Sequence, residues 1–312
     1  MPRPLFYSHP SSLEHETGGH PERAERIVAI ERELAARDWF GFDRVISPAV
    51  PRDVLELVHS AGYINSIELA AAAGGGQLDA DTVLSEGSFV AALHAAGGAV
   101  EMVARLLEAG AGAIGFSAHR PPGHHALSAR AMGFCLFNSI AVAASYAGNR
   151  LGCGRVMIVD WDVHHGNGTS DAFWGTDAVL FVSIHQWPLY PGSGHPSETG
   201  AGPGRGHTVN LPVPAGTGDD EYLSLIHDTV IPLARLYKPQ LLLVSAGFDA
   251  HHDDPLAGCV VTEQGFAGMA ATLRALCAEL EIPLGLVLEG GYELEALSRS
   301  VVATMEVLAA GS

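Results

Sequence analysis

The chain has 312 residues and a formal net charge of −18, from 35 acidic and 17 basic side chains. This charge repels phosphate backbones, so it argues against direct nucleic-acid binding and favours cationic substrates such as lysine-rich peptides or polyamines, unless it serves only solubility. The sequence shows neither an apolar run of membrane-spanning length nor a signal peptide, and its four cysteines form no C-x-x-C pair. We therefore expect a cytoplasmic protein without a membrane-bound segment.

Apolar segments alternate with helical patterns along the chain. The first part predicts strands at 5–8 and 45–47, a helix that starts near Pro21, helical segments over 52–73 that break at 60–62, a loop at 77–86 and a helix over 89–109. The second part predicts strands at 113–117, 155–159, 179–184, 240–246 and 284–288, and helices at 133–147, 221–236, 262–280 and 294–308. This alternation indicates one α/β domain over residues 1–312, with a parallel sheet covered by helices on both faces.

Polar residues directly follow four of the predicted strands. They are the pair His124 and His125, the segment 160–165, Asp249 and Tyr292. Because ligands of open parallel sheets bind beyond the carboxyl ends of the strands, we expect these side chains to share one site.

The segment after the strand at 155–159 carries candidate metal ligands. Asp162 and His164 are two positions apart, so on an extended segment they would point the same way, with Asp160 behind them. One imidazole and one carboxylate are two of the three protein ligands of a catalytic zinc site, and Asp249 is an obvious source of the third. The alternative is that these aspartates only cap a helix or form a turn. Convergence of several strand ends favours the metal site.

Five ordered motifs resemble the histone deacetylase superfamily, nearer to its class II and bacterial members. They are R-P-P-G-H-H-A from Arg120, G-F-C-L-F-N from Gly133, D-W-D-V-H-H-G-N-G-T from Asp160, S-A-G-F-D-A from Ser245 and E-G-G-Y from Glu289. The resemblance runs from about His20 to the last predicted helix. It implies the arginase/deacetylase α/β fold, with a central parallel sheet of about eight strands.

The resemblance also implies the cofactors. It assigns Zn²⁺ to Asp162, His164 and Asp249, with a metal-bound water that attacks an acetamide carbonyl. Fe²⁺ could occupy the same ligands, because affinity order alone does not choose between the two metals. A structural K⁺ is implied near the zinc, at the segments that contain Asp160, Asp162, His164, Ser183 and Ile184.

Catalytic roles follow from the same resemblance. His124 and His125 match the pair that acts as general base and as electrostatic or acid partner, and Tyr292 matches the tyrosine that donates a hydrogen bond to the oxyanion. Two adjacent histidines with different neighbours can be held in different protonation states, and a tyrosine with a pKa near about 10 remains a donor at neutral pH. Asn167 stands where class I members have an acid, so it should orient His125 without adding charge.

Substrate contacts are implied at four further positions. Gly133 and Phe134 match the glycine and the aromatic residue that line the acyl-lysine channel, and Tyr190 would form the opposite wall. Asp81 falls where the family has an aspartate at the rim that holds the substrate backbone.

Residues at specific positions distinguish the rival functions. A two-manganese ureohydrolase would need carboxylates where this chain has Gly166 and His251. Acetylpolyamine amidohydrolases of the class II type carry a gatekeeper glutamate at the position of Leu256, so leucine favours acyl-lysine. A non-catalytic acyl-lysine binding protein would not need an oxyanion donor.

The tract 251–254 (HHDD) is either a second metal site or a solvated loop. The leading hypothesis is a zinc-dependent deacetylase of acetyl-lysine peptides or proteins, and the sequence is also compatible with a homo-oligomer.

Overall fold

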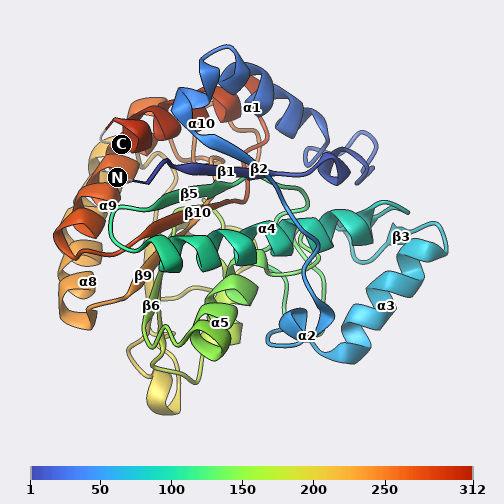
Figure 1. The fold of residues 1–312 in the computed structure, drawn as a ribbon, viewed down its shortest axis with the longest axis horizontal. Coiled ribbons are helices and arrows are strands. Elements are labelled where there is room, and N and C mark those ends of the chain that lie inside the picture. Colours follow the sequence, from blue (N-terminus) through green and yellow to red (C-terminus); the bar gives the residue numbers. More distant parts are fainter. Residues whose placement is uncertain (1, 311–312) are drawn as a thin grey trace.

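An eight-stranded sheet runs through the centre of the computed structural model, which describes residues 2–310 (Figure 1). The strands are β1 (Leu5–Ser8), β2 (Asp43–Ile46), β5 (Ile114–Ser117), β6 (Val156–Asp160), β7 (Val179–Gln186), β8 (Thr208–Val213), β9 (Leu241–Ala246) and β10 (Leu284–Leu288). Their order is β2-β1-β5-β10-β9-β6-β7-β8, and every neighbouring pair is parallel. The predicted domain over 1–312 includes Met1, Gly311 and Ser312, which lie outside the described residues.

Helices cover both faces of this sheet. The longer helices are α1 (Glu25–Ala35), α3 (Ala61–Ala72), α4 (Ser88–Ala109), α5 (Ser139–Leu151), α9 (Glu263–Glu279) and α10 (Leu294–Ala309), and the shorter ones are α2 (Arg52–Leu55), α6 (Asn167–Phe173), α7 (Asp219–Leu225) and α8 (Ile231–Tyr237). Leu242 and Val244 of β9 pack into one core with α1, α9 and α10, whereas Leu241 and Leu243 pack into a second core with α4 and α5. Alternate residues of a strand face opposite sides, so an apolar run such as L-L-L-V fits a sheet covered twice. The predicted architecture is confirmed.

Helix α4 is long and apolar enough, by length and composition, to cross a membrane. Its apolar residues instead lie in the core beneath β1 and β5 and beside α5. At Gly97 a Cβ atom would clash with the carbonyl oxygen of Pro48, so the small residues allow close packing. The composition of α4 is therefore explained by a core helix.

Two of the predicted elements near the site are wrong. Residues 133–138 are not helical, because Gly133 and Phe134 have positive φ angles of 57° and 68°, and the helix begins only after Asn138, whose side chain accepts a hydrogen bond from the Ala141 N–H. The predicted loop at 77–86 contains a short antiparallel pair, β3 (Gly76–Gln77) with β4 (Val83–Leu84). Both differences change the shape of the entrance to the site described below.

Strand β8 has no counterpart in the prediction. It pairs only with β7 at the edge of the sheet, and half of its residues are partly exposed. Asn210 and Pro212 also lower the strand propensity of β8. An edge strand tolerates such residues, because one of its sides forms no hydrogen bonds with a neighbouring strand. An edge strand of this kind lacks the continuous apolar run that identifies the central strands.

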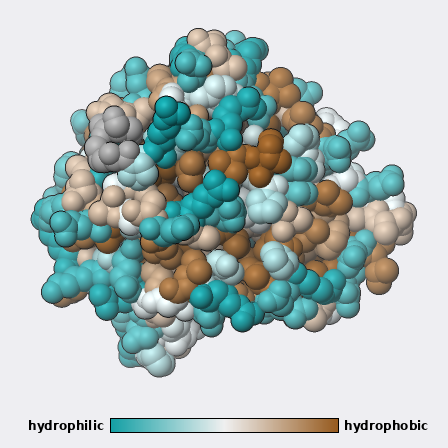
Figure 2. Space-filling model, viewed as in Figure 1, coloured by the Kyte–Doolittle hydropathy of each residue, from teal (hydrophilic) through white to brown (hydrophobic). Residues whose placement is uncertain are grey.

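The surface mixes polar and apolar residues. On the face shown in Figure 2, hydrophilic residues are interspersed with apolar areas. Exposed large apolar side chains are scattered over several helices and include Val28, Leu69 and Leu236. Single apolar residues of this kind do not define an interface, so the homo-oligomer stays a prediction.

Candidate active site

The segment after β6 brings the predicted metal ligands together by turning rather than by extending. The strand ends at Asp160, so the predicted extended geometry of Asp162 and His164 is wrong. The Asp160 carboxylate accepts the Asp162 N–H at 3.1 Å, and the Asp162 carboxylate accepts the His164 N–H at 2.9 Å. Each aspartate thus bonds to the backbone two residues later and curls the chain at the carboxyl end of the sheet.

Three ligand side chains converge there from two strands. The ring Nδ1 of His164 lies 3.3 Å from Asp162 Oδ1 and 3.0 Å from Asp249 Oδ2. All three residues are buried, and their ligand atoms lie within 4.8 Å of one another. Backbone N–H groups hold the carboxylates, because Gly290 donates to Asp162 at 2.8 Å and Val163 donates to Asp249 at 2.9 Å. The ligand set is therefore oriented before any metal binds.

The three buried ionisable side chains of this cluster shift one another's pKa values. Burial and the neighbouring charge of Asp162 raise the pKa of Asp249. Burial alone would lower the pKa of His164, but the carboxylates of Asp162 and Asp249 raise it to about 10. Without a metal, a proton on His164 compensates the two buried carboxylates. One imidazole and two carboxylates fit a divalent metal such as Zn²⁺ or Fe²⁺.

The two adjacent histidines have different neighbours. His124 Nδ1 lies 2.9 Å from Asp160 Oδ2, and His125 Nδ1 lies 2.8 Å from the side-chain oxygen of Asn167. Burial would lower the pKa of His124, but Asp162 and Asp160 raise it well above its usual value. Burial and the charges of His124 and His164 hold the pKa of His125 well below its usual value. These surroundings favour a proton on His124 and a neutral His125. The side-chain oxygen of Asn167 accepts from Nδ1–H of His125, which leaves the Nε2 lone pair of that ring free.

The turn that carries Tyr292 is fixed from two sides. The Arg26 guanidinium donates to the carbonyl oxygens of Gly291 at 2.6 Å and Glu289 at 2.5 Å, and its central carbon lies 5.0 Å from the Tyr292 ring. The Asp254 carboxylate accepts the Tyr292 N–H at 2.7 Å. Burial and the charge of Asp249 raise the pKa of the Tyr292 phenol well above its usual value. The phenol therefore remains a hydrogen-bond donor.

A channel leads to these groups. Its cavity of about 210 Å³ is lined by Asp81, His125, Gly133, Phe134, His164, Leu189, Tyr190, Leu256 and Tyr292. The Phe134 and Tyr292 rings meet edge-on with centroids 5.6 Å apart, and the Tyr190 ring meets His125 at 5.2 Å. All four residues predicted to contact substrate thus line the same cavity as the catalytic candidates.

Residues of the β3–β4 pair and its turn position Asp81 in the lining of the channel. The Asp79 carboxylate accepts the N–H groups of Asp81 and Thr82 at 3.1 and 2.7 Å. The Thr82 hydroxyl bonds to Asp81 and accepts the Phe134 N–H at 3.1 Å. Burial and the hydrogen bond with Asp79 raise the pKa of Asp81. The hairpin that the sequence did not predict therefore joins the rim to the channel wall.

Comparison with known proteins decides the family. The histone deacetylase domain family model matches residues 20–308. This chain belongs to the histone deacetylase family. A probable deacetylase from Archaeoglobus fulgidus is 40% identical over 293 residues, which are 92% of this chain and 80% of that protein. Histone deacetylase 10, chloroplastic, from Oryza sativa is 39% identical over 321 residues, 96% of this chain and 72% of that protein.

A solved structure confirms the deacetylase fold. The crystal structure of the HDA15 HD domain matches with a TM-score of 0.92 and 35% identity, over 99% of this chain and 88% of that one. The single α/β domain with its eight-stranded parallel sheet is the histone deacetylase fold, and the family is one of deacetylase hydrolases.

Several residues around this deacetylase site were not predicted. Arg26 lies in the helix that was predicted to start near Pro21, and Glu289 belongs to the E-G-G-Y motif, but neither was assigned a role at the site. The Glu289 carboxylate accepts the backbone N–H groups of Gly123 at 2.7 Å and His124 at 3.1 Å. For Glu289 the available signal was a charged residue directly after the apolar strand 284–288, but only the folded chain shows its partners.

The HHDD tract divides between core and surface. His251 and Asp254 are buried, whereas His252 and Asp253 are exposed, so neither predicted alternative describes the whole tract. Ligating atoms of residues 251–253 lie within 4.8 Å of one another. However, His251 Nδ1 already accepts the Asp253 N–H, and the Arg299 guanidinium lies 3.7 Å from the Asp253 carboxylate.

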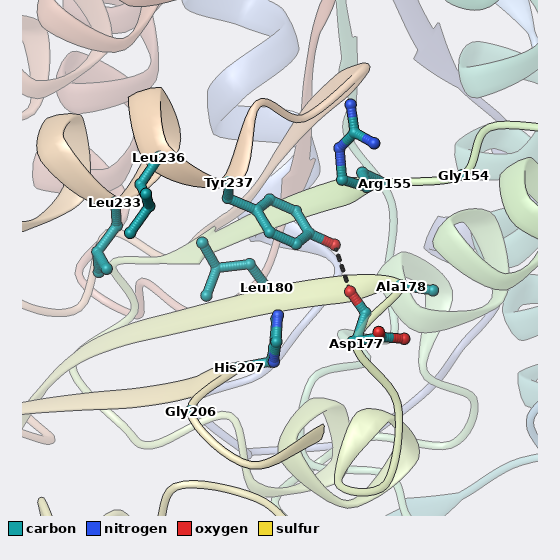
Figure 3. A pocket seen from close by; sticks show the side chains of 10 residues that line it. All are labelled: Gly154, Arg155, Asp177, Ala178, Leu180, Gly206, His207, Leu233, Leu236 and Tyr237. Carbon is teal, nitrogen blue, oxygen red and sulfur yellow. Dashed lines mark hydrogen bonds between the residues drawn. The ribbon is translucent and has the colours of Figure 1, made fainter. Parts of the chain in front are cut away.

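A larger hollow lies at the opposite end of the sheet, where β6, β7 and β8 begin (Figure 3). Its volume is about 560 Å³, and Leu233, Leu236 and Tyr237 of α8 line one side. The Tyr237 hydroxyl donates to the carbonyl oxygen of Asp177 at 2.9 Å. None of the metal-ligand groups found within residues 2–310 lies here. The chemistry of the lining residues, not cavity size, therefore identifies the deacetylase channel as the candidate active site.

Proposed function

We propose that this protein is a zinc-dependent deacylase that hydrolyses N-acetyl amides, with acetyl-lysine in peptides or proteins as the substrate. The observation that carries the proposal is the convergence of Asp162, His164 and Asp249 at the end of a channel walled by His125 and Tyr292. Hydrolysis breaks the amide C–N bond, adds one water, and releases acetate and the free amine.

Each group has a separate task in this reaction. When bound, zinc supplies a Lewis acid that polarises the carbonyl and lowers the pKa of a water molecule. His125 is neutral and presents its free Nε2, so it can accept the proton of the attacking water. The charged ring of His124 beside it stabilises negative charge, and a proton held by the pair can return to the leaving amine. The Tyr292 hydroxyl donates to the oxygen that becomes negative.

Leu256 supports acyl-lysine over acetylated polyamine, the second candidate substrate. A free polyamine carries further ammonium groups, which need a carboxylate near the channel wall. The wall instead offers an apolar side chain at this position, and Asp81, which also lines the channel and is partly exposed, is proposed to lie at its rim. This arrangement suits the neutral methylene chain of a lysine that emerges at a polar rim.

Placing a carboxylate in the wall is expected to change this selectivity. We expect the wild-type protein to favour an acetyl-lysine peptide over acetylputrescine and acetylspermidine, and Leu256→Glu to shift the ratio of kcat/KM values toward the polyamines by about 10-fold. Initial rates on the three substrates measure this ratio. Leu256→Gln, of similar size but uncharged, should leave it nearly unchanged. A wild-type preference for acetylpolyamines would contradict the peptide assignment.

The remaining assignments are part of the same proposal. Fe²⁺ could replace Zn²⁺ on the same three ligands. A K⁺ ion is proposed near the metal, where Asp160 of β6 and Ser183 of β7 are partners in the sheet register. We also propose that the protein is cytoplasmic. Direct nucleic-acid binding is not expected, because the net charge of −18 repels phosphate.

A further inference from the structure

The buried carboxylate of Asp254 joins two parts of the channel wall. Its Oδ2 accepts the backbone N–H of Tyr292 at 2.7 Å, and its Oδ1 accepts the backbone N–H of Leu256 at 3.0 Å. The residue is only 7% exposed. One side chain therefore links the turn that carries the candidate oxyanion donor to the turn that carries the apolar wall.

Backbone N–H groups, rather than a cation, stabilise this carboxylate. Among residues 2–310, no arginine, lysine or histidine forms a salt bridge with Asp254. Burial and the charge of Asp249 raise the pKa of Asp254 to about 7, whereas the N–H groups of Leu256, Tyr292 and Glu293 act in the opposite direction. A buried carboxylate without a cation is costly, so its hydrogen bonds to these backbone groups decide where it lies.

Several hydrogen bonds hold the turn before Tyr292. Gly290 and Gly291 precede the tyrosine, Gly291 has a φ angle of 119° that residues with side chains rarely adopt, and the Gly290 N–H bonds to Asp162. Arg26 holds the carbonyl oxygens of Glu289 and Gly291, but the backbone N–H of Tyr292 itself bonds to Asp254. A misplacement of about 1 Å at a reacting group can reduce the rate by about 100-fold.

We propose that Asp254 is a positioning residue that holds Tyr292 at the reacting carbonyl and Leu256 at the channel wall. This inference rests on the proposed deacylase function and adds a residue that controls both rate and substrate choice. In the HHDD tract (251–254), the buried Asp254 therefore has a positioning role, whereas the exposed Asp253 has no such role.

Asp254→Asn is the direct test. The amide offers one oxygen, and its NH₂ group would face one of the two backbone donors, so one hydrogen bond is lost. We expect kcat on an acetyl-lysine peptide to fall by about 10- to 100-fold, and the preference between peptide and acetylspermidine to change through Leu256. Asp253→Asn makes the same chemical change one residue away, at an exposed position, and should alter kcat by less than about 2-fold.

A double-mutant cycle with Tyr292→Phe separates positioning from general destabilisation. Once the phenol is gone, the position of the ring matters little to the oxyanion, so Asp254→Asn should cost less than about 3-fold in kcat in that background. An equal loss of kcat in both backgrounds would show that Asp254 does not act through Tyr292, and would overturn the proposal. Zinc content and thermal midpoint are measured for each variant, so that loss of metal or fold is recognised. If Asp254→Asn does not fold, Asp254→Glu keeps the carboxyl group but moves both oxygens, and the same fall in kcat is expected.

Affinity for a fluorescent hydroxamate, which chelates a metal and offers its carbonyl to a donor, provides a readout without turnover. We expect Asp254→Asn to weaken this affinity in the wild-type background and to have little effect in Tyr292→Phe. If the wild-type protein is active and Asp254→Asn behaves like Asp253→Asn, the positioning role is wrong and the deacylase function stands. If the zinc-loaded wild-type protein neither hydrolyses acetylated amines nor binds the hydroxamate, the proposed function is wrong, and this inference is wrong with it.

Discussion

Replacing Asp249 by asparagine is expected to lower kcat/KM on an acetyl-lysine peptide by at least about 1,000-fold and to remove the bound metal. A neutral amide is a poor ligand for zinc, and the change takes away one of the two carboxylates that face His164. Loss of the Lewis acid removes several kcal/mol of transition-state stabilisation, which corresponds to a change of this size. Metal content after zinc loading and initial rates on the same preparation measure both effects.

The matched control for this variant is Asp228→Asn. It makes the same chemical change at an exposed position between α7 and α8, away from the site, and should retain metal and activity. An Asp249→Asn protein that keeps a full complement of zinc and wild-type turnover would show that Asp249 is not a ligand.

Tyr292→Phe is expected to lower kcat by about 100- to 1,000-fold while KM changes little. The hydroxyl stabilises charge that develops only in the transition state, so its loss affects the chemical step more than substrate binding. The hydroxyl faces the channel, and no intramolecular hydrogen bond holds it within the described residues. Its removal should therefore leave zinc content and the thermal midpoint unchanged. Steady-state kinetics on an acetyl-lysine peptide separate kcat from KM.

Tyr146→Phe removes a hydroxyl from α5, outside the candidate active site, and serves as the control. A wild-type kcat for Tyr292→Phe would exclude the phenol as the oxyanion donor. A rise in KM with kcat unchanged would instead indicate that the phenol contributes only to ground-state binding.

The central sheet could be predicted because its strands are apolar on both faces. Leu241 to Val244 reads as a strand since each residue enters a core, two on each side. Strand β8 could not be predicted in the same way, because an edge strand with Asn210 and Pro212 buries only part of its surface. The predicted helix start at Gly133 was too early, because Gly133 and Phe134 have positive φ angles, which periodicity does not reveal, and α5 begins only after the cap residue Asn138.

Site residues that directly follow a strand could be predicted from the sequence. Residues that reach the site only through contacts with distant parts of the chain could not. Asp162 and Asp249 were found because each lies just beyond an apolar run. Arg26 lies 265 residues from Gly291, its partner, and Asp254 lies 38 residues from Tyr292, so no local pattern links these pairs. Loop residues of the channel, such as Tyr190, were accessible only through family resemblance.

The most direct measurement is the initial rate of the zinc-loaded protein on an acetyl-lysine peptide, before and after a chelator and again after zinc is restored. We expect hydrolysis that releases acetate, is lost with the chelator and returns with zinc, because Asp162, His164 and Asp249 form the ligand set at the end of the channel. Hydrolysis that continues unchanged in the metal-stripped protein, or no hydrolysis by the zinc-loaded protein, would contradict a zinc-dependent lysine deacetylase.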